Sequence, residues 1–246
     1  MKISIVIPAY NEAKRISETL ERIVLYLKNH QEVVEVIVVL NNCIDETNKI
    51  VEIFSKIDSR IQVLDCGVVR HHGSGTKGYA VRRGFEVAKG EYILFMDADN
   101  STDIFELDKL IPYIHESDSI IGSRYTKESK VLIHQSMIRI VLSRIGNLLT
   151  QIIILPGIKD TQCGFKLFSR DVIKKITPYL KINGWGFDIE LLAYTKKFGF
   201  TIKEIGITWS NHERSMVKPS AFFYVLYSLF LTFIRVTFGS RFSDSN

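Results

Sequence analysis

Short apolar runs alternate with amphipathic segments through the first half of the chain. The runs are rich in β-branched residues and predict strands at residues 3–7, 34–40, 61–65, 92–96 and 119–121. The segments between them repeat apolar positions at helical spacing and predict helices at residues 12–29, 45–55, 77–88 and 103–115. Strands that alternate with helices indicate an α/β, Rossmann-like fold with a mainly parallel sheet. In such sheets, ligands bind beyond the carboxyl ends of the strands.

The second half begins with a predicted amphipathic helix at residues 134–152. Apolar residues fill most of its faces, and one polar stripe recurs at a spacing of three to four residues. The stripe consists of Ser136, Arg139, Ser143, Asn147 and Gln151. Amphipathic helices of this kind cover a core or lie in an interface.

Residues 221–234 are almost entirely aliphatic or aromatic. Tyr224, Ser228, Thr232 and Arg235 form one thin polar face along this segment. The charge-free run 219–234 is shorter than the roughly 20 residues that a membrane span requires. We therefore expect an interfacial helix at a membrane surface and no transmembrane span, with a core helix of a soluble protein as the alternative.

The two halves of the chain differ in net charge. Residues 1–121 carry 14 Lys/Arg and 19 Asp/Glu, whereas residues 122–246 carry 18 and 8. We expect the basic half to face an anionic partner such as phosphate or a membrane surface. The chain has no Lys/Arg-rich run or known nucleic-acid motif, which argues against nucleic acid.

The ends of the chain and its cysteines bear on the compartment. Cys43, Cys66 and Cys163 are far apart and lack metal-ligand spacing, which indicates a reducing compartment. Met1 leads directly into the first strand pattern, so we expect no signal peptide. The length fits one large domain, which we place at residues 1–240 with a short tail at 241–246.

Two aspartates end the strand pattern at residues 92–96. Asp97 and Asp99 are separated by one small residue, so their carboxylates point to the same side of an extended chain. Two such carboxylates repel each other, and oxygen ligands favour Mg²⁺ or Mn²⁺. The pair predicts a metal site that grips a diphosphate. The structural alternative is a turn residue followed by a helix cap.

A glycine-rich segment supports a competing interpretation. Gly73, Gly75 and Gly78 match GxGxxG, and Asp97 follows at the end of the next strand, as in a dinucleotide site. However, residues 66–72 separate the motif from its strand, and Lys77 lies within it. A dinucleotide-dependent oxidoreductase remains an alternative function.

Taken together, the motifs resemble family 2 glycosyltransferases of the GT-A fold, and among them the polyprenyl- and dolichyl-phosphate sugar transferases. The resemblance covers roughly residues 2–240 in matching order. It implies a nucleotide-sugar-binding half at residues 1–125 and an acceptor- and membrane-facing half at 126–240. On the donor side it implicates Pro8, Tyr10, Glu12, Lys77, Arg82, Asp97 and Asp99.

On the acceptor side, the resemblance assigns Arg124 and Arg139 to the acceptor phosphate. The segment 160–168, Asp-Thr-Gln-Cys-Gly-Phe-Lys-Leu-Phe, is the strongest subgroup signature. Asp188, within Trp185-Gly-Phe-Asp188, is the candidate for an acidic residue at the reaction centre. With Asp99 it completes the expected catalytic set.

The chain departs from the family pattern in two places. Asn41-Asn42-Cys43 stands where relatives have Asp-Asp-Gly. Asn41 could therefore hydrogen-bond the base of the nucleotide, but it lacks the negative charge of an aspartate. Arg214-Ser215-Met216 lacks the usual lysine of Gly-Ser-Lys, and Arg214 and Lys218 flank the gap. We therefore expect Lys218 to help bind the acceptor phosphate.

The resemblance implies an inverting, metal-dependent hexosyltransferase that acts at the cytoplasmic face of a membrane as a peripheral protein. Its expected donor is UDP-glucose or GDP-mannose, its expected acceptor is polyprenyl phosphate, and its cofactor is Mg²⁺ or Mn²⁺. A lipid phosphate is already anionic, whereas a saccharide hydroxyl would require Asp188 as a base. A saccharide acceptor and a non-catalytic nucleotide-sugar-binding subunit remain alternatives.

Overall fold

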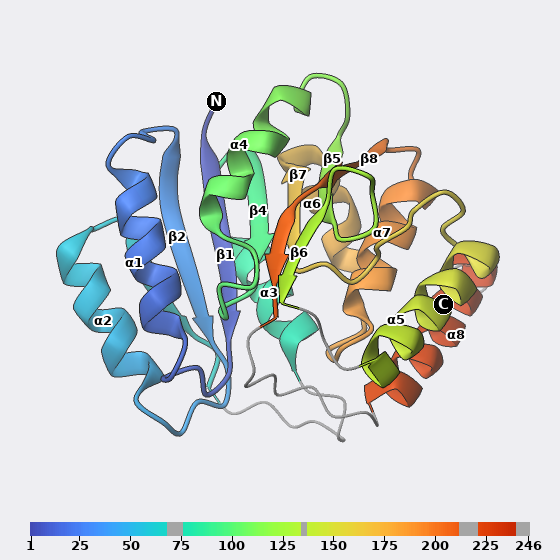
Figure 1. The fold of residues 1–246 in the computed structure, drawn as a ribbon, viewed down its shortest axis with the longest axis horizontal. Coiled ribbons are helices and arrows are strands. Elements are labelled where there is room, and N and C mark those ends of the chain that lie inside the picture. The colour runs from blue at the N-terminus through green and yellow to red at the C-terminus, as the bar shows by residue number, and fades with distance from the viewer. Residues whose placement is uncertain (68–75, 134–136, 212–220, 240–246) are drawn as a thin grey trace, which may run out of the picture.

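The computed structural model describes residues 1–67, 76–133, 137–211 and 221–239. Within these ranges, a seven-stranded sheet has the order β3-β2-β1-β4-β7-β5-β8 (Figure 1). Its strands are β1 (Ile3–Ala9), β2 (Val33–Leu40), β3 (Ile61–Asp65), β4 (Tyr92–Met96), β5 (Ser119–Ser123), β7 (Phe165–Ser169) and β8 (Ile202–Gly206). Neighbouring strands are parallel except at β7, which is antiparallel to β4 and β5. The predicted mainly parallel α/β sheet is confirmed.

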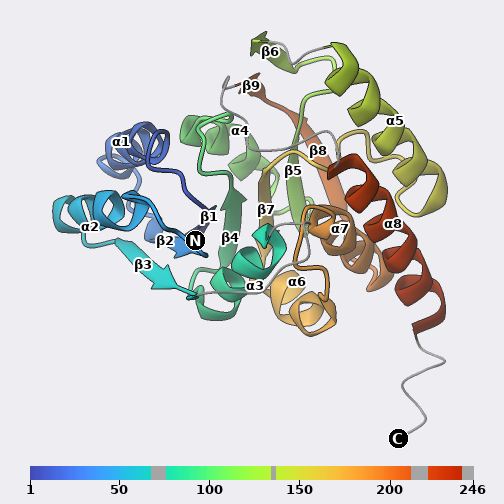
Figure 2. The same ribbon diagram turned by 90° about the horizontal axis from the view of Figure 1, so that it is seen from below.

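Helices cover both faces of the sheet (Figure 2). On one face, α1 (Ile16–Leu27), α2 (Thr47–Ile57) and α4 (Leu107–Leu110) pack with the alternate side chains of β1 and β2. On the other face lie α3 (Lys77–Val87), α6 (Arg170–Ile176) and α7 (Phe187–Lys197). β1 and β2 are buried on both faces, because parallel strands covered by helices on each side meet no water.

Outside this core, β6 (Lys130–Ile133) and β9 (Thr208–Ser210) pair as a separate parallel ribbon. The long helices α5 (Met137–Ile153) and α8 (Ala221–Phe238) contact each other at one side of the molecule. α8 also packs against α7, which fixes this helical pair to the sheet.

Two sequence expectations were incomplete. The helix expected at residues 103–115 is divided into a 3₁₀ turn (Ile104–Glu106), α4 and a second 3₁₀ turn (Ile111–Tyr113). Pro112 lacks an N–H group and obstructs a continuing α-helix, which accounts for the break between α4 and the second 3₁₀ turn. Strand β7 was not predicted, because Lys166 interrupts its short apolar run, yet Lys166 is fully buried.

Candidate active site

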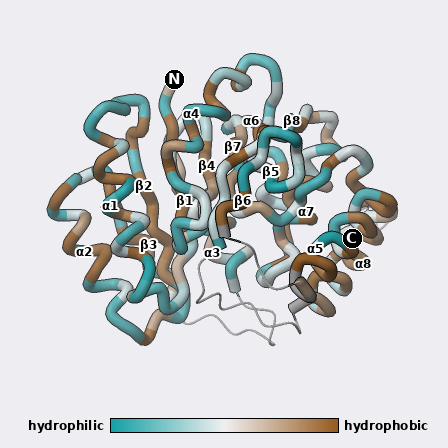
Figure 3. Tube along the Cα trace, viewed as in Figure 1, coloured by the Kyte–Doolittle hydropathy of each residue, from teal (hydrophilic) through white to brown (hydrophobic). Residues whose placement is uncertain are grey.

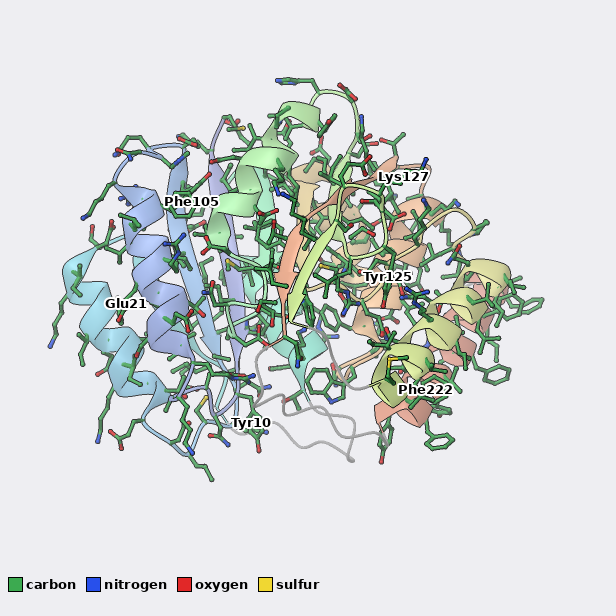
Figure 4. The ribbon with its side chains drawn as sticks, in the orientation of Figure 1. Tyr10, Glu21, Phe105, Tyr125, Lys127 and Phe222 are labelled. Carbon is green, nitrogen blue, oxygen red and sulfur yellow. The ribbon has the colours of Figure 1, made fainter. Side chains whose placement is uncertain are left out.

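The carboxyl ends of β1, β2 and β4 meet at the lower edge of Figure 1. Asn11, Asn42 and Asn100 follow these three strands and adopt positive φ angles of 53°, 54° and 53°. Asparagine tolerates this left-handed conformation better than most residues, so the chain can turn sharply there. Tyr10 and Phe222 lie along this same lower edge, which brings the start of α8 to the same side of the molecule (Figure 4).

Asp97 lies directly after β4 and faces a cation. Its Oδ1 atom lies 2.5 Å from Nζ of Lys77, the first residue of α3. The Asp99 carboxylate lies 3.6 Å from Nη1 of Arg15 and accepts a hydrogen bond of 3.0 Å from the Ser101 N–H. Both side chains are only partly exposed, at 30% for Asp97 and 24% for Asp99. The structure thus brings Lys77, Asp97 and Asp99 together, and their metal- and donor-binding roles stay predictions.

This cluster has an excess of negative charge. Burial raises the pKa of Asp97, and the charges of Asp99 and Asp188 raise it further against the opposing effect of Lys77. Burial disfavours the charged form of Lys77, but Asp97, Asp188 and Asp99 outweigh it and raise the pKa of Lys77. A bound cation would offset the excess negative charge and so lower the raised pKa values of both Asp97 and Lys77. The residues present therefore fit a hard divalent ion.

Protein ligands alone do not complete a metal cage here. Among the described residues, no group of three or more His, Cys, Asp or Glu side chains is placed to hold a metal ion. A site with only two carboxylates leaves the other coordination positions of the metal ion open. Such a site suits Mg²⁺ or Mn²⁺, which commonly take their other ligands from substrate phosphates and water.

Glu12 lies beside this pair and is held by a residue that the sequence analysis missed. Arg15 donates two hydrogen bonds to the Glu12 carboxylate, of 2.7 Å and 2.6 Å, and also approaches Asp99. Burial raises the pKa of Glu12 to about 7, with Asp99 and Asp97 adding to the effect and Arg15 opposing it. No sequence motif marks Arg15, because its role depends on the fold, which sets the start of α1 beside Asp99.

The other predicted donor residues surround this edge. Pro8 is buried in β1, whereas Tyr10 is 44% exposed beyond its end. Asn41 is buried, and its amide nitrogen donates to the backbone oxygen of Thr76 at 3.1 Å and to the Thr76 hydroxyl. Asn41 therefore connects the end of β2 to the start of α3.

Arg82 lies further along α3 and contacts the segment that precedes α7. Its guanidinium donates to the Leu180 carbonyl oxygen at 2.8 Å and to Oδ1 of Asn183 at 3.1 Å. These contacts show Arg82 bracing a loop, and its role in donor binding stays a prediction. Gly73 and Gly75 of the glycine-rich motif lie outside the described residues, whereas Gly78 packs against Ile182 and Phe187.

The signature segment 160–168 forms a layer directly behind the site. Asp160 binds the Arg124 guanidinium through both carboxylate oxygens, at 2.7 Å and 2.8 Å. The Gly164 carbonyl oxygen accepts a hydrogen bond of 3.0 Å from the Asp97 N–H. A Cβ on Gly164 would lie 2.0 Å from Oδ2 of Asp97, so any side chain at this position would displace that carboxylate. The segment thus supports Asp97 and Arg124 from within.

Asp188 lies in the first turn of α7 and is paired with a buried lysine. Lys166 Nζ lies 2.5 Å from Oδ1 of Asp188, and the two side chains are 0% and 5% exposed. The charge of Asp188 acts on both Lys77 and Asp97, which places it within electrostatic reach of the carboxylate cluster. Its catalytic role stays a prediction, and Lys166 is a partner that the sequence analysis did not identify.

The predicted acceptor-phosphate residues are only partly described. Arg124 is 12% exposed, bound to Asp160 and stacked near Tyr125 and Trp209. Arg139 falls within α5, but its side chain lies outside the described residues, as does Lys218. The structure therefore places Arg124 against Asp160, and the acceptor-phosphate role of all three residues stays a prediction.

Comparison with known proteins identifies the class that this fold and site define. The sequence pattern of Glycosyl transferase family 2 matches residues 4–177. The dolichyl-phosphate beta-glucosyltransferase ALG5D of Trichomonas vaginalis is 34% identical over 230 residues, covering 89% of this chain and 68% of the relative. The dolichyl-phosphate beta-glucosyltransferase of Homo sapiens is 33% identical, covering 89% and 70%.

The structure also resembles a glucosyl-3-phosphoglycerate synthase of Mycobacterium tuberculosis solved with Mn²⁺, UDP and phosphoglyceric acid. The TM-score is 0.71 at 19% identity, and the match covers 94% of this chain and 78% of the synthase. This likeness establishes the GT-A-like fold. The chain belongs to glycosyl transferase family 2 and is a glycosyltransferase. This assignment favours the glycosyltransferase interpretation of Lys77 and Gly78 over the oxidoreductase alternative.

Proposed function

We propose that the chain transfers a hexose from a nucleoside-diphosphate sugar to a polyprenyl phosphate at a membrane surface. The observation that carries the donor half is the Asp97 and Asp99 pair at the carboxyl end of β4, with Lys77 against it. The curated relatives at 33–34% identity are named dolichyl-phosphate beta-glucosyltransferases, which favours a polyprenyl-phosphate acceptor and glucose as the sugar.

Asp97 and Asp99 would hold the divalent ion that the cluster fits. When bound, Mg²⁺ or Mn²⁺ would neutralise the charge that develops on the departing diphosphate. Lys77, with its raised pKa, stays protonated and supplies a fixed positive charge beside the same position. The solved mycobacterial synthase with Mn²⁺ and UDP supports this choice of metal and donor class.

The protein's remaining task is to position the acceptor. A phosphate oxygen is already anionic at neutral pH, so a strong general base is not needed and orientation dominates. Asp188 is fixed by Lys166 within reach of the cluster, which suits electrostatic positioning better than proton abstraction. Arg124, which Asp160 holds, and Arg139 and Lys218 are the proposed phosphate contacts.

The two long helices support the membrane part of the proposal. In α8 the polar stripe faces the protein: Ser228 and Thr232 are buried, and Arg235 pairs with buried Glu190 at 3.1 Å. The opposite face is exposed and aromatic. Its exposed residues are Phe223 (72%), Tyr227 (61%) and Phe230 (59%). This orientation is the reverse of an amphipathic helix in water.

α5 shows the same reversal. Asn147 and Thr150 face inward, where the Asn147 side chain accepts hydrogen bonds from Thr161. The outward stripe is apolar and consists of Met137, Val141, Ile145, Leu148 and Ile152. The apolar colouring of both helices is visible at the right of Figure 3. Contiguous apolar surface of this kind indicates a binding face, and aromatic side chains suit a membrane interface.

The described helices are too short or too polar to cross a bilayer. We therefore propose that α5 and α8 lie in the interface, on the basic half of the chain. Both helices begin near the active-site edge, which would present the site to a lipid phosphate (Figure 1). The cytoplasmic face is the proposed side.

The test is to incubate the purified chain with polyprenyl phosphate, Mn²⁺ or Mg²⁺ and a panel of nucleotide sugars that includes UDP-glucose and GDP-mannose. We expect sugar-lipid product with one donor, its loss on chelation, and its loss in Asp99→Ala with the fold intact. Near-normal turnover by Asp99→Ala would exclude the metal assignment. Donor binding without product would favour a saccharide acceptor or a non-catalytic subunit.

A further inference from the structure

We propose that a groove between α3 and α6 binds a small phosphorylated molecule with an apolar body. The groove has a volume of about 760 Å³, within the range of small-molecule sites. Ile93 and Arg170 line it at the start of β4, at the opposite end of that strand from Asp97. The site is therefore separate from the carboxylate cluster, and the inference does not depend on the proposed function.

The floor of the groove is apolar. It is formed by side chains that are at most 7% exposed, on α3, β4, α6 and the segment before α7. They are Phe85, Ala88, Ile93, Ile173 and Leu180. A floor of this kind favours an organic body over a bare inorganic ion, because apolar surface is removed from water on binding.

The rim of the groove is cationic. Arg170 and Lys174 lie on α6, and Lys181 lies on the segment that follows it. In the described part of the chain, no carboxylate lies within 4 Å of the charged groups of these three residues. The acid among the lining residues, Glu86, is paired with Arg83. The positive charge that faces the groove is therefore not neutralised by the protein.

Arg170 points most directly to an anion. Its Nη2 atom is buried and has no hydrogen-bond partner in the described structure. A buried donor without a partner carries a desolvation cost, and a guanidinium matches phosphate oxygens through two parallel hydrogen bonds. A phosphate held by Arg170, Lys174 and Lys181 would balance the charge of the rim, and a rotation of the Arg170 guanidinium would bring its unpartnered Nη2 atom to the ligand.

The shape and position of the groove favour a soluble molecule over a lipid headgroup. The apolar faces proposed to meet the membrane belong to α5 and α8, whereas the groove is formed by α3 and α6 (Figure 2). The residues that line the groove are also connected to the donor side of the fold. The Arg82 side chain donates hydrogen bonds to Leu180 and Asn183. The Asn183 carbonyl oxygen in turn accepts a hydrogen bond from the Tyr79 N–H in the first turn of α3. A ligand in the groove would thus contact the segment that packs beside Lys77.

The experiment uses phenyl phosphate as the probe, because it combines one phosphate with an apolar ring. Its binding to the full chain is measured by calorimetry with EDTA present, so that no divalent ion binds at Asp97 and Asp99. We expect saturable binding, tighter than that of inorganic phosphate. Arg170→Gln/Lys174→Gln should weaken it by about tenfold or more, because two charge-assisted contacts are lost.

Two further variants keep the test decisive. Lys56→Gln/Lys175→Gln removes the same charge outside the groove and should leave the affinity unchanged. Glu86→Gln removes the acid from the lining and should tighten binding about two- to fivefold. Equal affinity in wild type and Arg170→Gln/Lys174→Gln, equal weakening in the control pair, or no tightening in Glu86→Gln would each overturn the assignment.

Discussion

The backbone of Gly164 lies directly against the carboxylate of Asp97. A Cβ at position 164 would approach Asp97 Oδ2 to 2.0 Å and Oδ1 to 2.5 Å, which no side chain can do without displacing that carboxylate. The glycine of the 160–168 signature is therefore a shape requirement of the active site. It explains why a residue without a side chain belongs to a functional motif.

Gly164→Ala should consequently impair turnover more than folding. The added methyl group pushes the Asp97 carboxylate out of place, and a misplacement of about 1 Å can cost roughly a hundredfold in rate. Mn²⁺ affinity and kcat should both fall, while the circular dichroism spectrum stays native. Gly146→Ala on α5 is the matched control, because its Cβ meets only Phe222 at 3.6 Å. Normal Mn²⁺ affinity in Gly164→Ala would contradict the packing argument.

The Lys166–Asp188 pair allows a structural role to be separated from a catalytic one. Removing one partner of a buried ion pair leaves an uncompensated charge, so Lys166→Met should lower the free energy of unfolding by about 3–5 kcal/mol. The double variant Lys166→Met/Asp188→Leu should recover much of that loss, since both charges are gone.

Activity then distinguishes the two roles of Asp188. If Asp188 positions the reactants, the double variant stays inactive although urea unfolding shows that its stability has recovered. Substantial glycosyl transfer by the stable double variant would show that Asp188 serves the fold alone.

The aromatic face of α8 should control membrane association. Replacing Phe223, Tyr227 and Phe230 with serine removes exposed apolar surface, so binding to anionic liposomes should fall at least tenfold in flotation assays. Thermal stability should change little, because these side chains are 59–72% exposed.

The control is a matched triple variant on the far side of the molecule. Leu25 on α1 and Ile53 and Ile57 on α2 are also exposed apolar residues, at 45%, 57% and 60%, and their replacement by serine should leave liposome binding unchanged. Equal binding by the two triple variants would argue against α8 as the membrane face.

Acid should weaken the protein through Asp160. Burial alone would raise the pKa of this carboxyl, but Arg124 outweighs it and holds the pKa below its ordinary value. A lowered pKa in the folded state means that the pair stabilises the protein above about pH 4, and that this stability is lost as the pH falls through the folded pKa.

Urea unfolding at pH 5 and pH 3 measures this effect. Asp160→Asn should be less stable than wild type at neutral pH and should show a shallower loss of stability on acidification. The same acid dependence in both proteins would mean that other carboxyls dominate.

The sequence by itself determined the alternation of strands and helices, the carboxylate pair at the end of β4 and the family. These features are local: burial periodicity is set along one segment, and Asp97 and Asp99 lie two residues apart. Lys77, Glu12 and Asn41 were assigned to the donor side by the resemblance to the family, which the order of the motifs along the chain carries.

The tertiary structure decided which distant residues support that site. Arg15, Gly164 and Lys166 act through contacts with Asp99, Asp97 and Asp188, and none of these contacts is encoded by a short spacing. Lys166 also concealed strand β7, since a lysine in a short run indicates exposure until a buried carboxylate is found for it.

The orientation of α5 and α8 was likewise beyond the reach of periodicity. A helical pattern shows that polar and apolar faces exist, but it does not say which face meets the protein. The inward face of each helix is set by buried partners. Glu190 forms an ion pair with Arg235 of α8, and Thr161 donates a hydrogen bond to Asn147 of α5. Because these polar contacts draw the polar stripes inward, the apolar faces remain outside.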